Sequence, residues 1–400
     1  MPGMSAIIAV TNENGEGKMR LLYSNMLPLK LGDGQTAFID YFMDAVREAD
    51  EIDIAVGYVS KAALKELQGL VDEAGIKRVC LTIGMYYHEG MPEGTYNVAA
   101  ALNEDWTGRG IGEVRLVRAF KYHGKVYVFY KNGKPFSAVV GSHNLGAVKL
   151  EASNLRQYEL SAVTEEPEEL QEISAHVRDI MLPKCSANIA DLRDVPLIRE
   201  VNRALVDQEF VSKVTPEEVD AYKKRMTNVS FELPLKVPED ENDQSMRGSN
   251  INVCYASGRK RVWWEIEMVV SKSIRDLPGY PLHQQPFMAV TDDGWKFQAW
   301  TCGQNNKNLY SKDDLKIMGR WIKGRLVAAG LVEPVNRVES DLDGKGVITH
   351  KMLNKYGRDT ITLTKTDIVT KTEDGTELEV WMLSFLPESR HQQEAEDEIS

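Results

Sequence analysis

A histidine and a lysine stand two residues apart in the segment Tyr-His-Gly-Lys-Val-Tyr-Val-Phe, at His123 and Lys125. The apolar residues around them predict a strand, on which residues two apart emerge on the same face. Gly124 between them is expected to leave that face open to a bulky group. An imidazole can attack phosphorus, and an ammonium group can neutralise the charge that develops on the phosphate oxygens. The pair therefore indicates phosphoryl transfer that needs no metal and no cofactor.

Three further polar residues follow this pair, each next to an apolar run. The run Val139–Gly141 leads into a tight turn with Ser142 and Asn144, whose hydroxyl and amide groups are neutral donors for phosphate oxygens. Glu159 begins another apolar run, where its carboxylate would bond the second nitrogen of an imidazole and fix the tautomer. A second imidazole must protonate the leaving oxygen. His143, inside the turn, is interpreted as a support of the motif, with contact to the scissile phosphate as the less favoured alternative.

The elements that must position these side chains alternate between strand and helix over the first 165 residues, which predicts an α/β fold. Helices are expected over 61–73, with Ser60 as the N-cap, and over 95–105. Strands joined by helices predict a largely parallel sheet that is covered on both faces. Buried strands are expected over residues 52–59, 79–85, 114–118, 126–130, 137–140 and 158–163.

Beyond residue 165 the pattern predicts a helical connector and then a mostly β region. Helices are expected over 165–185, 192–205, 215–226 and 316–329. Strands are expected over 263–270 and 287–290, and a hairpin turn over 292–294. The chain is thus expected to comprise an α/β domain, a connector, a β domain and a disordered acidic tail, at 1–180, 181–235, 236–390 and 391–400.

The composition excludes several classes of protein. The 400 residues are 42% hydrophobic and 27% charged, which is ordinary for a globular protein with more than one core. No run approaches the roughly 18 apolar residues that span a bilayer, and the N-terminus lacks a secretory pattern, so a cytoplasmic protein is expected. The four cysteines lie far apart without a Cys-x-x-Cys pair, which favours reduced thiols over disulfides or zinc.

The net charge of −12 argues against unspecific coating of nucleic acid, but the charge is unevenly spread. Residues 245–330 contain 13 Lys or Arg against seven Asp or Glu, which indicates oriented contact with an anionic partner. Five of the seven tryptophans also lie there, and core packing is the favoured interpretation for most of them.

Two groups of side chains in this stretch have the chemistry to contact DNA. They are a basic triplet, Arg259, Lys260 and Arg261, and a set of amides with one lysine, Gln304, Asn305, Asn306 and Lys307. From composition alone, a solvated surface explains the triplet as well as a DNA contact does. Three basic residues of the helix that follows are candidates for phosphate contacts: Arg320, Lys323 and Arg325.

The order His-x-Lys, Gly-Ser-x-Asn and a downstream Glu resembles the active-site motifs of the phospholipase D superfamily. In detail the N-terminal half resembles the NgoFVII-type (BfiI-like) restriction endonucleases, which implies an α/β domain with a mixed sheet flanked by helices. The residues that carry this resemblance are Leu21–Asn25, Ile54–Ser60, Leu81–Tyr86, Tyr122–Phe129, Gly141–Leu145 and Tyr158–Glu159.

Two departures from the superfamily pattern matter. An Asp is usual seven residues after the histidine, where this chain has Tyr130. The restriction-enzyme relatives lack that Asp too, so the change disfavours a lipase more than a nuclease. The superfamily site also needs two His-x-Lys copies, and this chain has one. Single-copy members form one site across a two-fold axis, so a homodimer is expected in which His123 of the second copy is the general acid.

The second half resembles the B3-like DNA-binding domain of the same enzymes, a pseudobarrel whose two arms grip the major groove. The resemblance runs through Gly248–Asn252, Phe287–Gly294, Cys302–Lys307, Leu315–Leu326 and Tyr356–Arg358. It implies that Arg259–Arg261 lie in one arm and Gln304–Lys307 in or near the other. Together the two halves predict a sequence-specific, metal-independent endonuclease of double-stranded DNA in restriction or anti-phage defence.

Two other functions remain open from the sequence. One is a phosphodiesterase of the phospholipase D type that acts on a substrate other than DNA. The other is a DNA-binding protein with a degenerate nuclease domain, against which the retention of His123, Lys125, Asn144 and Glu159 argues. Some relatives cut only with a separately encoded ATPase. No Gly-x-x-x-x-Gly-Lys-Ser/Thr loop occurs here, so an ATPase partner would be a separate protein.

Overall fold

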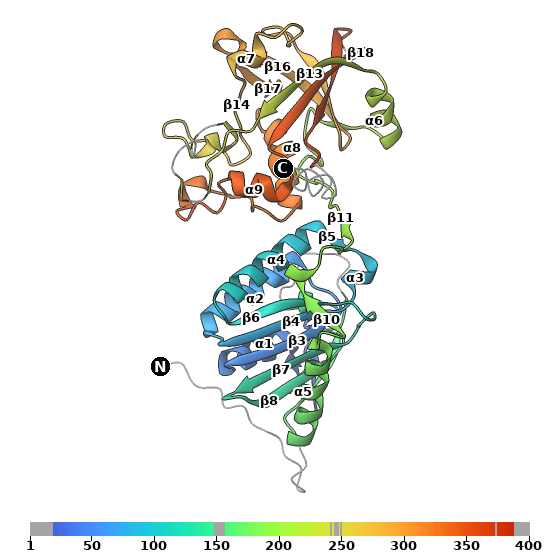
Figure 1. Cartoon of the computed structure of the whole chain (residues 1–400), viewed down its shortest axis with the longest axis vertical. Helices are drawn as coiled ribbons and strands as arrows, with labels where there is room; N and C mark the ends of the chain where they lie inside the picture. Colours follow the sequence, from blue (N-terminus) through green and yellow to red (C-terminus); the bar gives the residue numbers. More distant parts are fainter. Residues whose placement is uncertain are drawn as a thin grey trace. The chain divides into compact units, whose positions relative to one another are not determined.

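The computed structural model describes residues 19–147, 157–240, 242–243, 248, 250–372 and 374–387. The chain forms two compact units that divide between Arg199 and Glu200, here called unit 1 and unit 2 (Figure 1). The expected acidic tail, 391–400, and part of the polar stretch before residue 250 lie outside the described residues. Within the described part of the chain, no helix is both long and apolar enough to cross a membrane.

Unit 1 is built on a nine-stranded mixed sheet with the order β10-β6-β4-β3-β7-β8-β9-β1-β2. The strands β3, β4 and β6 pair in parallel, whereas β7, β8 and β9 are antiparallel to their neighbours. The strand bounds are β1 Arg20–Tyr23, β2 Thr36–Ala37, β3 Glu51–Val56, β4 Arg78–Ile83, β6 Gly112–Val117, β7 Lys125–Lys131, β8 Lys134–Gly141, β9 Leu160–Thr164 and β10 Ser186–Asn188.

The mixed sheet that the resemblance implies is confirmed, whereas the expectation of a largely parallel sheet is wrong. Strands β7 and β8 are joined by Asn132 and Gly133, which have φ values of 52° and 73°. Two successive residues with positive φ make the tight hairpin turn that only antiparallel strands can share. No helix separates these two strands, and they pair antiparallel.

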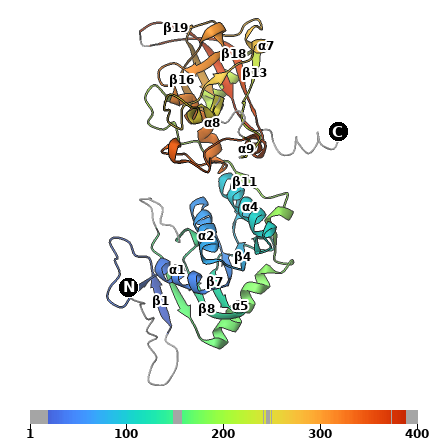
Figure 2. The ribbon, with the colours of Figure 1, turned by 90° about the vertical axis from the view of Figure 1, so that its left-hand side faces the viewer.

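Helices cover both faces of the unit 1 sheet, as expected (Figure 2). On β7, Tyr127 and Phe129 enter the core formed with α1, α2 and α4, whereas Val126 and Val128 enter the core formed with α5. Neighbouring residues of a strand point to opposite faces, so α5 lies opposite the other three helices. The bounds are α1 Phe38–Glu48, α2 Lys61–Ala74, α3 Tyr86–Glu89, α4 Glu93–Gly108, α5 Pro167–Met181, η1 Leu145–Ala147 and η2 Ile189–Asp191.

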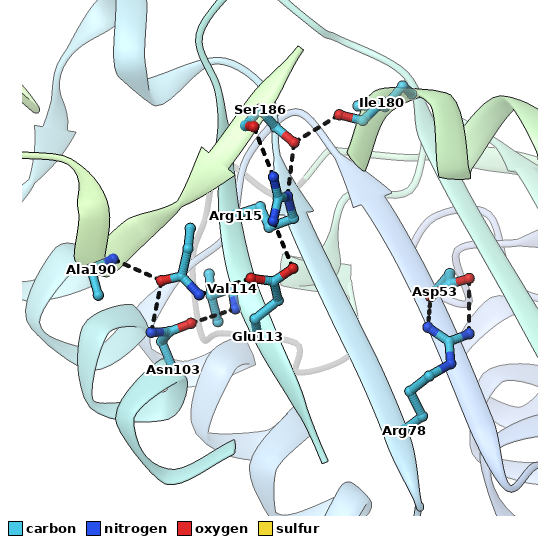
Figure 3. Close-up of polar contacts among 10 residues, drawn as sticks. Asp53, Arg78, Asn103, Glu113, Val114, Arg115, Ile180, Ser186 and Ala190 are labelled. Atoms are coloured by element: carbon cyan, nitrogen blue, oxygen red, sulfur yellow. Dashed lines mark hydrogen bonds and ion pairs between the residues drawn. The ribbon is translucent and has the colours of Figure 1, made fainter. Parts of the chain in front are cut away.

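Local signals in unit 1 act as the sequence suggests. Ser60 accepts a hydrogen bond from Ala63 N at 3.2 Å and so caps α2. At the sheet edge, Arg115 donates to both the hydroxyl and the carbonyl of Ser186, at 3.0 and 2.8 Å, which ties β10 to β6 (Figure 3).

The helix expected over 192–205 does not form. Pro196 disfavours a helix there, and Leu197–Ile198 (β11) pairs instead with Met91–Pro92 (β5).

Unit 2 is a strand-rich sheet with the order β13-β18-β19-β15-β16-β17-β14, and β12 pairs with β16. All of its pairs are antiparallel except β15 with β19. The strand bounds are β12 Ser212–Lys213, β13 Met226–Pro234, β14 Met268–Val269, β15 Phe287–Thr291, β16 Trp295–Cys302, β17 Asn308–Ser311, β18 Thr360–Lys371 and β19 Glu377–Ser384.

The helices of unit 2 pack onto this sheet around a core rich in aromatic residues. The expected hairpin at 292–294 and the expected helix over 316–329 are both present. The long strand expected over 263–270 is not: only Met268 and Val269 pair, because Trp263 turns into the core and donates to Gly346 O at 2.8 Å. The bounds are α6 Pro216–Lys223, α7 Lys272–Arg275, α8 Lys316–Ala328, α9 His350–Tyr356, η3 Asn250–Tyr255, η4 Gln304–Asn306 and η5 Val338–Ser340.

Candidate active site and DNA-binding surface

His123 lies at the carboxyl ends of the central parallel strands of unit 1. It stands just before β7, whereas Lys125 is the first residue of that strand, so His123 lies outside the strand that was predicted to carry both residues. Tyr122 N donates to Gly84 O, at the end of β4, at 3.1 Å. A Cβ atom on Gly84 would lie 2.0 Å from Tyr122 O, so only glycine allows this approach. The close backbone contact fixes the loop that carries His123.

The Lys125 ammonium lies directly beside the His123 ring. Its Nζ is 3.1 Å from Nε2 and 3.2 Å from Nδ1, and it donates to His123 O at 2.6 Å. The Lys125 side chain is buried, and this burial lowers its pKa, while the nearby Glu159 carboxylate acts in the opposite direction. The structure thus brings the two predicted residues together, with the imidazole exposed and the ammonium group beneath it.

The space beside Gly124 is filled by the protein itself. A Cβ atom there would lie 2.4 Å from the Tyr122 hydroxyl, so the expectation that Gly124 leaves the surface open is wrong. Within the described residues that buried hydroxyl has no hydrogen-bond partner, and burial raises the pKa of Tyr122 to about 12. The Tyr122 ring packs near His176 of α5, with ring centroids 6.1 Å apart. Gly124 therefore accommodates a tyrosine that supports the loop.

Asn144 and Ser142 differ in how they are held at the end of β8. The Asn144 side-chain oxygen accepts from Tyr58 N at 3.1 Å, which leaves its amino group as the end that can donate to a phosphate. The Ser142 hydroxyl donates to Leu160 O at 3.2 Å and accepts from Leu160 N at 3.0 Å. Ser142 therefore closes the β8–β9 ladder with the group that was predicted to contact phosphate.

The Glu159 carboxylate is close enough to Lys125 for its charge to oppose the lowering of the Lys125 pKa by burial. Burial raises the pKa of Tyr127 well above its ordinary value, and the Glu159 charge acts in the same direction. The Glu159 backbone is held by Ser24, whose hydroxyl accepts from Glu159 N at 3.0 Å. Among the described residues no hydrogen bond joins the Glu159 carboxylate to His123 of the same chain. The predicted contact with an imidazole is therefore a proposal about the assembled site.

Tyr58, which the sequence analysis did not assign to the site, packs against His123. The Tyr58 ring meets the imidazole edge-on, with centroids 5.9 Å apart and planes at 78°. The Tyr58 hydroxyl donates to Glu89 Oε2 at 2.5 Å, and Lys121 donates to the other oxygen of Glu89 at 3.1 Å. A Cβ atom on Gly57 would lie 3.2 Å from the imidazole, so this side of the ring is closely packed. Only the resemblance through Ile54–Ser60 pointed toward Tyr58.

His143 is part of the core, which agrees with its interpretation as a support. It is 1% exposed and stacks on Phe38, with centroids 4.3 Å apart. Its ring nitrogens are 3.2 Å from the Ser24 hydroxyl and 2.7 Å from the Ser161 hydroxyl. Burial lowers the pKa of His143 to about 4.

We expect His143 to make folding sensitive to acid. In the unfolded chain it binds a proton near pH 6.5, whereas in the folded chain it does so only near pH 4. The unfolded state therefore binds more protons in this window, so the free energy of unfolding falls as the pH drops from 6.5 to 4, by up to about 3 kcal/mol. Denaturant titrations at several pH values measure this slope. His143→Asn should lose it, and equal slopes in both proteins would contradict the assignment.

Tyr130, at the position of the superfamily's Asp, is structural. It pairs with Glu51 at the far end of β7, whereas Lys125 pairs with Val56 at the near end. Its hydroxyl is 2.9 Å from the Ser174 hydroxyl on α5, and Arg78 lies over its ring at 5.5 Å. Arg78 also donates to both oxygens of the buried Asp53, at 2.7 and 3.1 Å (Figure 3). No part of this cluster adjoins His123.

The predicted basic triplet of unit 2 is partly neutralised. Arg259 forms an ion pair with Glu265, and Lys260 lies 3.5 Å from a Glu339 carboxylate oxygen. Arg261 lies near enough to Tyr310 of β17 to lower the pKa of that phenol, against the larger effect of burial. A phosphate would have to displace or share these carboxylates, so the triplet is a weaker anion site than its sequence suggests.

The predicted amides form the turn between β16 and β17. Gln304 and Asn305 are exposed, whereas Asn306 donates from its side chain to Pro281 O at 2.7 Å. Lys307 is half-buried, and its carbonyl accepts from Val270 N at 2.7 Å.

Two of the three basic residues of α8 are not available for phosphate. Lys323 is fully buried, donates to Trp263 O and lies 3.7 Å from the Cys254 sulfur, and burial lowers its pKa to about 8. Arg325 is buried in an ion pair with Asp292. Arg320 lies over the Trp264 ring at 5.1 Å. The expectation of phosphate contacts from α8 is wrong for Lys323 and Arg325, because α8 is packed into the core.

Family models match both units of the chain. Residues 36–194 match the NgoFVII restriction endonuclease N-terminal PLD domain, and residues 221–367 match the NgoFVII C-terminal B3-like DNA-binding domain. The class of the protein is therefore that of phosphodiesterases with a phospholipase D fold. With both domains present in this order, the chain belongs to the NgoFVII restriction endonuclease family, and its B3-like domain supports DNA as its partner.

Several solved structures are similar to part of the chain. The phospholipase D family member Nuc from Salmonella typhimurium is 17% identical, with a TM-score of 0.28 over 43% of this chain and 97% of its own. NucT from Helicobacter pylori is 16% identical, with a TM-score of 0.28 over 42% of this chain and 97% of its own. Phosphatidylserine synthase from Haemophilus influenzae is 16% identical, with a TM-score of 0.32 over 45% of each chain. No curated protein matches the chain.

Proposed function

We propose that the chain is a metal-independent, sequence-specific endonuclease of double-stranded DNA that works in restriction or anti-phage defence. The observation that carries this proposal is the Lys125 ammonium within 3.2 Å of both ring nitrogens of an exposed imidazole, His123. The imidazole can act as the nucleophile, and the ammonium group beside it can neutralise the charge that develops on the phosphate oxygens. The B3-like unit on the same chain directs this chemistry to DNA.

The reaction has two balanced steps. In the first, the His123 imidazole attacks phosphorus, a nitrogen–phosphorus bond forms, and the bond to the leaving oxygen breaks. The imidazole of the second copy donates a proton to that oxygen. In the second step this same imidazole takes a proton from water, which attacks phosphorus and releases His123. Lys125 and the Asn144 amino group neutralise the phosphate oxygens in both steps, and Glu159 orients an imidazole.

A second copy is needed because one chain supplies one such imidazole, and unit 1 has an apolar face for it. Val140 of β8 and Leu21 of β1 both pair with Ala162 of β9, so the three side chains share one face. Val140 and Leu21 are 40% and 38% exposed, and Leu160, two residues from Ala162 on that face, is 45% exposed. These residues lie beside Ser142 and Asn144. A homodimer that covers them would bring the two half-sites together into one composite active site.

We expect Tyr58 to position the imidazole. Tyr58→Ala removes the ring that packs against His123 and should lower kcat for DNA cleavage by about tenfold, because small misplacement of a reacting group is costly. Tyr58→Phe keeps the ring and loses only the bond to Glu89, so it should retain most of the activity. The two variants are compared by their cleavage rates at saturating DNA. Equal loss in both variants, or a change confined to KM, would argue against positioning.

The proposed function is tested by digestion of unmethylated plasmid DNA in EDTA, with sequencing of the ends. We expect defined cut positions that do not require a divalent metal. Because some relatives depend on a separately encoded ATPase, a second arm adds a candidate partner ATPase with ATP and the Mg²⁺ that ATP hydrolysis requires. Metal dependence of the nuclease step is measured in the arm without ATPase, where cleavage only on addition of Mg²⁺ would refute the phosphohistidine route. The ATP arm carries a non-hydrolysable analogue as its control.

A further inference from the structure

Next to the amide turn of unit 2, η4, lies a second loop, residues 281–285, that sequence reasoning did not associate with it. The two are joined through Thr301 of β16. Thr301 O accepts from Gln284 N at 2.7 Å, and its hydroxyl is 3.1 Å from both Pro281 O and Leu282 O. The side chain of Asn306 closes the junction by donating to Pro281 O at 2.7 Å. Loop and turn therefore form one continuous surface.

This surface presents amide side chains on a fixed backbone. Its exposed polar members are His283, Gln284, Gln285, Gln304 and Asn305. Gln284, Asn305 and Asn306 have φ values of 56°, 56° and 58°, a left-handed conformation that is unfavourable for residues other than glycine. Such a backbone persists only where surrounding contacts hold it, as the bonds to Thr301 and Pro281 do here. The surface is thus ordered before any ligand binds.

Residues in or next to the turn carry polar atoms without partners. In the described part of the chain, the buried side-chain oxygens of Asn306 and Asn308 accept no hydrogen bond. Buried polar atoms are normally satisfied by protein or by ordered water, so these two oxygens mark spare hydrogen-bonding capacity at the turn.

We propose that loop 281–285 and the turn at Gln304–Asn306 form one base-reading surface, and that the DNA sequence it recognises includes adenine. Gln and Asn side chains bond the N6 amino group and N7 of adenine in the major groove as a matched donor and acceptor. Lys307 follows the turn directly and provides a cation for an adjacent phosphate. This inference rests on the proposed function, because it takes DNA as the ligand.

The experiment selects bound sequences from a random duplex library in EDTA, with the full-length protein carrying His123→Ala so that bound DNA is not cleaved. In this background Gln285→Ala and Gln304→Ala are compared with the wild-type surface, and Asn354→Ala is the matched control. Asn354 is an exposed amide of α9, at the opposite end of unit 2 from α7 and the loop that follows it (Figures 1 and 2). The melting temperature of each variant verifies folding, which these exposed positions should leave unchanged.

The wild-type motif is expected to contain A·T pairs. Gln285→Ala and Gln304→Ala should each lose discrimination at one or two of them by about five- to 150-fold, with other positions and the salt dependence of binding unchanged. Retention of the full motif by both variants, as in the control, would overturn the inference, and so would a motif without A·T pairs. Failure of the proposed function is seen separately, as absence of cleavage in EDTA while the selected motif persists.

Discussion

Replacing His123 by alanine should abolish cleavage of DNA in EDTA, with a loss of about four orders of magnitude or more. In the dimer the substitution removes both the nucleophile and the general acid of the composite site. Because these two groups act as a unit, removing both abolishes the same catalytic contribution. Because the imidazole is exposed at the end of a loop, its removal should leave the fold and the binding of DNA by unit 2 intact. Cleavage rates and DNA affinity, measured on the same preparation, separate the two properties.

The matched control for this variant is His88→Ala. His88 is also an exposed histidine of unit 1, on α3, and its ring packs against Tyr87 rather than against the site. It should keep the wild-type rate. If His123→Ala cleaved DNA as fast as His88→Ala does, the phosphohistidine proposal would have to be abandoned. A second nucleophile would then have to be sought in the chain.

The second large effect concerns the dimer. Wild-type and His123→Ala chains, co-expressed in equal amounts with different tags, should pair at random, so only about a quarter of the dimers contain two imidazoles. If each site needs both copies, the mixed dimer is inactive, and the activity for each wild-type chain falls to about half. Purification through both tags isolates the mixed dimer for direct assay.

Independent sites would give a different result. Each wild-type chain would then keep its full activity whatever its partner, and the doubly purified dimer would cleave at about half the wild-type rate. Such an outcome would contradict the composite site while leaving His123 as the nucleophile. Leu160→Glu is a separate probe of the interface, because a charge on the exposed apolar face of β9 should weaken pairing.

Much of the catalytic site could be predicted because its signals are local. His123 and Lys125 are neighbours along the chain, and the turn at Ser142 and Asn144 follows directly from a buried strand. The tertiary partners of these residues could not be predicted from the sequence in the same way. Tyr58 and Glu89 are 31 residues apart and meet only when β3 and the end of β4 align. Nothing in their local spacing shows that contact.

The errors have the same origin. Lys323 and Arg325 look like a basic helix face in sequence, but their charges are met by Trp263 O and Asp292, which tertiary packing brings to α8. Loop 281–285 was passed over because its polar side chains carry no pattern of their own. Its importance appears only through the bonds of Thr301 and Asn306. The mixed sheet, by contrast, was foreseeable from the Asn-Gly pair between β7 and β8.

The most direct test of the account is a covalent bond between the protein and DNA phosphate. Radiolabelled DNA carrying the recognition sequence is mixed with the enzyme in EDTA, quenched in alkaline denaturant and separated from free DNA on a denaturing gel. Phosphohistidine survives alkali and is hydrolysed by acid, so the account predicts a labelled protein band that acid removes and that His123→Ala lacks. Rapid cleavage with no such band at any quench time, or a band that persists in His123→Ala, would contradict it.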